Sequence, residues 1–133
     1  MLISNWTGGK DTALDVTVVN PLQAAMVAQA ATTPGHALTC AYNRKMQGTA
    51  AACRREGMVF IPLPVETLGG WHDQAVQQVK KLGAALSRQT GQEESEAIRH
   101  LFQRLSVLLV RGNAALFLNR IPSFPATVID GVE

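Results

Sequence analysis

The fold is decided by the stretch Ala13-Leu14-Asp15-Val16-Thr17-Val18-Val19-Asn20-Pro21, which has the composition of a β-strand that is ended by a proline. Side chains in a strand alternate between its two faces. One face of this strand carries Leu14, Val16 and Val18, and the other carries Ala13, Asp15, Thr17 and Val19. Both faces are largely apolar, so the pattern predicts an interior strand that is covered on both sides.

Asp15 stands in the middle of this apolar strand. A carboxylate is costly to bury unless a metal ion, a lysine or several backbone N–H groups pair with it. The strand therefore either carries a functional site or provides a local structural partner for this charge. In the non-functional reading, Asp15 is a core aspartate whose charge is paired by neighbouring groups, or it lies at a strand edge that is open to water.

Composition bounds the class of protein. The chain has 133 residues, of which 47% are hydrophobic and 17% charged, so it is long and apolar enough for one folded domain. A net charge of +2 is compatible with a protein that binds nucleic acid but is not diagnostic of one. The low content of aromatic residues, 5%, argues against a surface on which bases stack. Cys40 and Cys53 lack the spacing of a zinc site. We expect an intracellular protein, with the nucleus as one option, and no membrane partner.

The rest of the chain predicts an α/β domain with a small mixed sheet flanked by helices and a helical C-terminal half. Beside the central strand, the sequence predicts strands over Met1–Trp6 and Met58–Val65 and helices over Leu22–Ala31, His36–Glu56, His72–Arg88 and Glu93–Asn119. The last helix has an apolar stripe that we expect to face inward: Ile98, Leu101, Phe102, Leu105, Leu108, Leu109 and Leu116. Residues 1–120 are read as one domain, in which 71–120 form a helical extension, and residues 121–133 as an irregular tail.

Lys45 lies at the centre of the apolar face of the predicted helix His36–Glu56. Its ammonium group either reaches past its neighbours to water or meets a buried acid. A right-handed crossover through this helix would make the central strand and the strand Met58–Val65 parallel neighbours. Asp15 and Lys45 would then come within reach of each other, as a structural ion pair or as part of a metal-dependent nuclease site.

Four segments together resemble the restriction-endonuclease-like domain that non-LTR retrotransposons carry C-terminal to their reverse transcriptase. These segments are Leu14-Asp15-Val16-Thr17-Val18, a following helix that contains Arg44-Lys45, Val59-Phe60-Ile61-Pro62-Leu63-Pro64-Val65, and Leu68-Gly69-Gly70. The resemblance covers about Leu2 to Trp71. The later segments Ile98–Leu105 and Val110–Ala114 look like the C-terminal tails of retroelement polyproteins.

This family belongs to the PD-(D/E)XK nucleases, and the resemblance implies roles for two residues. Asp15 matches the second acidic residue, which binds the metal, and Lys45 matches a catalytic lysine that these elements place on the following helix. Thr17 stands where the usual pattern has its lysine. The resemblance implies Mg²⁺, or Mn²⁺, as cofactor of an active enzyme. It also implies DNA as substrate and a reverse transcriptase domain of a longer polyprotein as partner.

The sequence departs from the family at its first acid, a Pro-Asp pair that would fall before or at Met1. We therefore expect an N-terminally truncated domain that is weak or inactive as a nuclease. Among the other candidates, Asp11 suits a turn cap, and Glu66 suits a solvated or capping loop acid. His72 and His100 lack partners at ligand spacing, and Trp6 and Trp71 are expected to seal the core.

Three hypotheses follow. The chain is a metal-dependent DNA endonuclease that nicks target DNA for reverse transcription, with Asp15 as metal ligand and Lys45 as the cation that orients water or stabilises the transition state. Alternatively, it is a non-catalytic remnant that binds nucleic acid or protein. In the third hypothesis it is a structural α/β domain in which Asp15 and Lys45 form a buried pair, whose disruption would cost about 3–5 kcal/mol.

Overall fold

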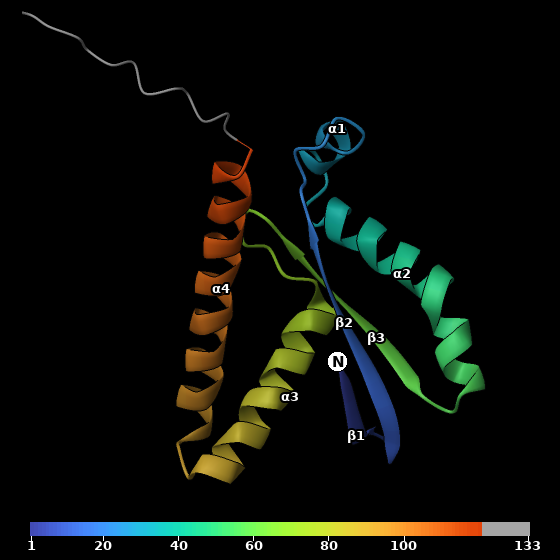
Figure 1. Cartoon of the computed structure of the whole chain (residues 1–133), viewed down its shortest axis with the longest axis vertical. Helices are drawn as coiled ribbons and strands as arrows, with labels where there is room; N and C mark the ends of the chain where they lie inside the picture. The colour runs from blue at the N-terminus through green and yellow to red at the C-terminus, as the bar shows by residue number, and fades with distance from the viewer. Residues whose placement is uncertain (121–133) are drawn as a thin grey trace, which may run out of the picture.

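The computed structural model describes residues 1–120 (Figure 1). They form a three-stranded sheet with the crossover helix on one face and the last two helices on the other. The elements follow the chain as β1 (Leu2–Thr7), β2 (Lys10–Val19), α1 (Val27–Ala30), α2 (His36–Arg55), β3 (Val59–Glu66), α3 (Asp73–Thr90) and α4 (Glu94–Leu118). The predicted order of strands and helices is confirmed, although α1 is a single turn. The tail predicted over 121–133 lies outside the described residues.

The sheet is mixed, in the order β1-β2-β3. β1 and β2 form an antiparallel hairpin, whose turn uses Gly8 and Gly9 at positive φ. β3 runs parallel to β2, with Pro62 opposite Asp15, and α2 makes the crossover between them. This confirms the predicted parallel pair. Pro62 and Pro64 fit β3 because this strand pairs on one side only within the described sheet.

The core has two parts, one on each face of the sheet. On the α2 face, the end of β2 packs against the start of the helix, through Val19, Ala37, Leu38 and Ala41. On the opposite face, both parallel strands pack against α3, through Leu14, Leu63 and Ala75, with Ile3, Ile61, Trp71 and Leu82 around them. Both clusters are apolar, so hydrophobic burial fixes the two helix layers on the sheet.

The expectation that β2 is covered on both sides is wrong for its second half. Val16 is 64% exposed and Val18 is 49% exposed. α3 packs beside Leu14 and then runs toward β1, where Gln78 hydrogen-bonds Trp6, so it leaves this part of the face bare. β1 accompanies β2 only as far as Leu14, so that within residues 1–120 the β1-side edge of β2 is open beyond that residue.

α4 packs on α3 and forms an outer layer on that side of the molecule (Figure 1). Gly83 of α3 lets the two helices approach closely, because a Cβ at this position would lie 2.7 Å from Ile98 Cγ1. Two members of the predicted inward stripe are nevertheless exposed, Leu108 at 62% and Leu116 at 59%. α3 and α4 lie closest near the loop that joins them and diverge away from it (Figure 1), and α3 is also the shorter helix, with 18 residues against 25, so α3 does not cover the second half of α4.

α4 is apolar along much of its length. The helix Glu94–Leu118 reaches a mean hydropathy of 1.3 over 18 residues, and is therefore long and apolar enough to cross a membrane by length and composition alone.

Candidate functional site

Asp15 and Lys45 form an ion pair, with Lys45 Nζ 2.8 Å from Asp15 Oδ2. β2 places Asp15 on the sheet face that packs against α2, and the crossover helix carries Lys45 over the strand. The sequence prediction that a parallel crossover brings these two residues together is confirmed. It is the only ion pair within residues 1–120.

The pair is not buried, which corrects the expectation of a core carboxylate. The side chain of Lys45 is 35% exposed and that of Asp15 is 39% exposed. An ion pair with this access to water contributes on the order of 0–1 kcal/mol, rather than the several kcal/mol expected of a buried pair. Both groups are accessible to a ligand from solvent, and replacing either one leaves no stranded charge in the core.

Thr17 follows Asp15 on the same face of β2. Its Oγ1 atom is buried and has no hydrogen-bond partner among the described residues. This hydroxyl is the nearest polar group along the strand to the ion pair, and the sequence analysis gave it no role beyond its match to the position of the usual lysine.

The donor set provides one ligand for a divalent cation. Within residues 1–120 no group of three His, Cys, Asp or Glu side chains could hold a metal ion. Mg²⁺ commonly keeps several waters and binds through one or two carboxylates together with the phosphates of its substrate. The accessible carboxylate of Asp15 fits this role as a single ligand, so that Mg²⁺ or Mn²⁺ would bind weakly and with the help of a phosphate.

Of the remaining acids predicted as candidates, Asp11 has a hydrogen-bond partner and Glu66 lies against its own loop. Asp11 accepts a hydrogen bond from the backbone N–H of Asn5 at 3.1 Å, across the hairpin turn, which confirms it as a turn cap. Glu66 ends β3, and its carboxylate lies over Gly70, where an added Cβ would be 2.7 Å from Glu66 Oε2. Neither acid joins the Asp15–Lys45 pair in an ion pair or a hydrogen bond.

The histidines and tryptophans have structural contacts. His72 caps α3 by accepting a hydrogen bond from Gln74 N–H, and its ring stacks on Tyr42 at 4.5 Å between centroids. Neither the cap nor the stacking was predicted from the sequence, because a histidine is not a common cap and no local pattern links His72 to α2. Trp6 donates to Gln78 Oε1 at 2.7 Å, and Trp71 meets Phe102 edge to face. The prediction that the tryptophans seal the core is confirmed for Trp71, which packs against the core cluster on the α3 face, whereas Trp6 contacts Gln78 and Lys81 of α3.

A second feature, also missed from sequence, is a hollow near the ends of β2 and β3, where the loops leave the parallel strands. Parallel strands often place binding sites at their carboxyl ends. The hollow is lined by Pro34, Gly35, Leu38, Thr39, Glu66, Gly70, Trp71, His72 and Asp73. Neither Asp15 nor Lys45 lines it, so it is separate from the ion pair.

Comparison with known proteins adds no family to this geometry. No model of a protein family, no curated protein and no solved structure matches the chain.

Proposed function

We propose that the chain is a retroelement-derived, metal-dependent DNA endonuclease domain with low intrinsic activity. The observation that carries the proposal is the 2.8 Å contact between the Lys45 ammonium group and the Asp15 carboxylate, on a central strand and its crossover helix. The resemblance of the surrounding segments to restriction-endonuclease-like domains supports the same assignment. DNA is the proposed substrate, and a reverse transcriptase in the same polyprotein is the proposed partner.

In this proposal each residue has one role. Asp15 is the carboxylate ligand of Mg²⁺ or Mn²⁺, and a bound metal would neutralise phosphate charge and lower the pKa of a bound water. Lys45 is a cation next to that carboxylate, placed to bind a phosphate oxygen or to orient water. Their exposure of more than a third gives a DNA backbone access to both groups.

The low activity follows from the donor set. One carboxylate holds Mg²⁺ loosely, and in this structure that carboxylate is already paired with Lys45. The same observation favours the second candidate function, a non-catalytic module that binds nucleic acid or protein through this fold. The two candidates differ in one measurable respect, which is whether Asp15 supports cleavage.

Nicking of supercoiled plasmid in the presence of Mg²⁺ or Mn²⁺ tests the proposal. We expect slow, metal-dependent nicking by the wild-type chain that falls to background in Asp15→Ala and Lys45→Ala, because each variant removes one of the two proposed groups. Arg44→Ala is the matched control, since Arg44 is exposed beside Lys45 on α2 and makes no ion pair within residues 1–120.

Circular dichroism should show that all three variants stay folded, because a half-exposed pair contributes little stability. Wild-type nicking no faster than that of Asp15→Ala would refute catalysis and leave the non-catalytic module. Binding of a fluorescent DNA duplex, measured by anisotropy, would then separate a nucleic-acid-binding module from a protein-binding one.

A further inference from the structure

An apolar hollow lies beside α1, between the segment that follows β2 and the loop that follows β3. It is lined by residues of the segment 21–35, among them Leu22 and Val27, and by Glu66 and Leu68. Leu22 is 62% exposed, Val27 39% and Leu68 68%. Three large apolar side chains of this hollow are therefore in contact with solvent as far as residues 1–120 are concerned.

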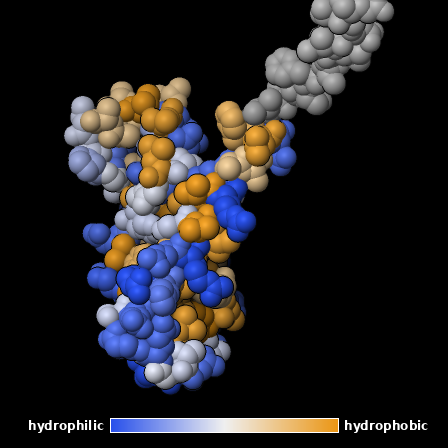
Figure 2. Space-filling model, turned by 90° about the vertical axis from the view of Figure 1, so that its left-hand side faces the viewer, coloured by the Kyte–Doolittle hydropathy of each residue, from blue (hydrophilic) through white to orange (hydrophobic). Residues whose placement is uncertain are grey.

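The last turns of α4 lie at the same end of the molecule as α1 (Figure 1). Asn113 Nδ2 donates a hydrogen bond to the carbonyl oxygen of Thr67 at 3.0 Å, so α4 contacts the residue that precedes Leu68 of the hollow. One turn further on, Leu116 and Phe117 are exposed. Figure 2, in which the α4 side faces the viewer, shows a recess at this end of the molecule with apolar groups on both sides.

We propose that residues 121–129 of this chain bind in the hollow, with Phe124 as the anchor. The chain continues beyond Arg120, at the end of the molecule where the hollow lies. Arg120 stands seven residues after Asn113, which is about 10 Å along a helix, and the four residues from Arg120 to Phe124 span about 13 Å when extended. Phe124 therefore reaches back to the level of Leu68.

The absence of charge on both sides supports this occupant. Residues 20–43, which supply one wall of the hollow, contain no Asp, Glu, Lys or Arg, and neither do residues 121–129. Glu66 is the only charged residue among the described residues that line the hollow, and its carboxylate lies over Gly70 in its own loop. Binding therefore covers apolar surface without leaving a charge of either segment unpaired.

The sequence of the segment also lowers the entropy that binding costs. Pro122 and Pro125 restrict the residues before them, Ile121 and Phe124, to extended conformations. A segment that has fewer conformations when free loses less entropy on binding. Because the segment is tethered to α4, its effective concentration at the hollow exceeds that of the same segment on a second copy in dilute solution.

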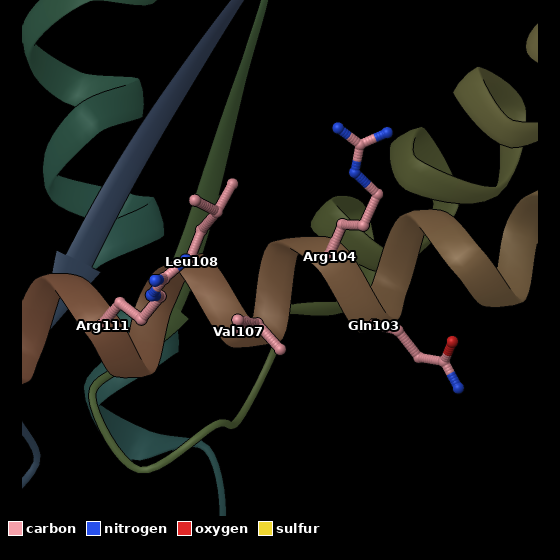
Figure 3. A pocket seen from close by; sticks show the side chains of 5 residues that line it. All are labelled: Gln103, Arg104, Val107, Leu108 and Arg111. Carbon is pink, nitrogen blue, oxygen red and sulfur yellow. The ribbon is translucent and has the colours of Figure 1, made fainter.

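Another hollow, on α4 itself, suits this segment less well. It is lined by Gln103, Arg104, Val107, Leu108 and Arg111, all from one helix (Figure 3). Arg104 and Leu108 project from the same side of the helix (Figure 3). An uncharged segment that covered Leu108 would therefore also remove water from arginine without pairing its charge, which is unfavourable.

Disulfide trapping in the full chain tests the contact. Ala31→Cys in the hollow and Ser123→Cys next to the anchor are introduced together with Cys40→Ser and Cys53→Ser, which remove the two native thiols. Oxidised glutathione is the oxidant. We expect a monomeric disulfide to form at least about tenfold faster than in the control pair Ala114→Cys/Ser123→Cys, because docking holds the first pair together.

Ala114 is a matched control because it is also an exposed alanine, six residues before Arg120 and within reach of a segment that binds nowhere. Phe124→Ser, added to the Ala31→Cys/Ser123→Cys chain, should slow disulfide formation to the control rate, since serine gains little from an apolar hollow. Val132→Ser, outside residues 121–129, should leave the rate unchanged.

Three results would overturn the proposal. The first is an equal rate for the two cysteine pairs, and the second is a Phe124→Ser chain that reacts as fast as its parent. The third is a disulfide-linked dimer on a non-reducing gel, which would place the segment on a second copy of the chain. Circular dichroism should show the same helix content in all variants, because none of the substituted side chains belongs to the two core clusters.

Discussion

Replacing Gly83 by alanine is expected to destabilise the protein by about 2 kcal/mol, although alanine is the better helix former. The added Cβ would lie 2.7 Å from Ile98 Cγ1 and 2.8 Å from Ile98 Cα. The side-chain atom can rotate away, but the Cα atom moves only if α4 shifts relative to α3. We estimate that this overpacking destabilises the protein by about 3 kcal/mol, and that the higher helix propensity of alanine offsets about 1 kcal/mol of this loss.

Gly48→Ala is the control for this prediction. Gly48 lies inside α2, and nothing stands within 4 Å of the place where its Cβ would be. Alanine there should raise the free energy of unfolding by about 0.5–1 kcal/mol. Urea denaturation followed by circular dichroism measures both variants. Equal stabilisation by the two substitutions would mean that α3 and α4 do not approach each other as closely as the structure places them.

Leu14→Ala is expected to have the largest effect on stability, a loss of about 3–4 kcal/mol. Leu14 is 2% exposed and packs with Leu63 and Ala75 at the contact between the sheet and α3. Truncation to alanine removes buried methyl groups and leaves a cavity that the rigid strands cannot close. The free energy of unfolding in urea is the measurement.

Val16→Ala provides the matched comparison, because Val16 is two residues further along the same face of β2 but 64% exposed. We expect a loss of about 0.5 kcal/mol, mainly from the lower strand propensity of alanine. If Leu14→Ala proves unfolded without urea, Leu14→Val should retain a measurable transition with a loss of about 1 kcal/mol. Similar losses for Leu14→Ala and Val16→Ala would contradict the uneven cover of β2.

Much of the fold could be predicted because local chemistry decides it. Four β-branched residues in a row fix β2, Asn20-Pro21 ends it, and the positive φ of Gly8 and Gly9 makes the hairpin turn. The handedness of crossovers then fixes β3 as a parallel neighbour. From this topology alone, the contact between Asp15 and Lys45 could be predicted, and the structure confirms it.

What the sequence could not provide is the extent of cover. An apolar pattern tells which side of an element avoids water, but not whether another element is long enough to shield it. Val16 and Leu108 both fit a buried pattern, yet both are exposed, since α3 runs toward β1 and diverges from α4 (Figure 1). The burial of the Asp15–Lys45 pair, on the opposite face of the sheet under α2, was overestimated as well.

The open edge of β2 divides the amides of this strand into two classes. Leu14 N–H donates to the carbonyl group of Met1, and backbone groups alternate along a strand, so the N–H groups of Val16 and Val18 point away from β3 into solvent. Those of Asp15 and Thr17 point toward β3. In deuterated water, the second half of the middle strand would therefore take up isotope at every second residue, at Val16 and Val18. By the chemistry of its backbone, β2 is an interior strand for half of its length and an edge strand for the remainder.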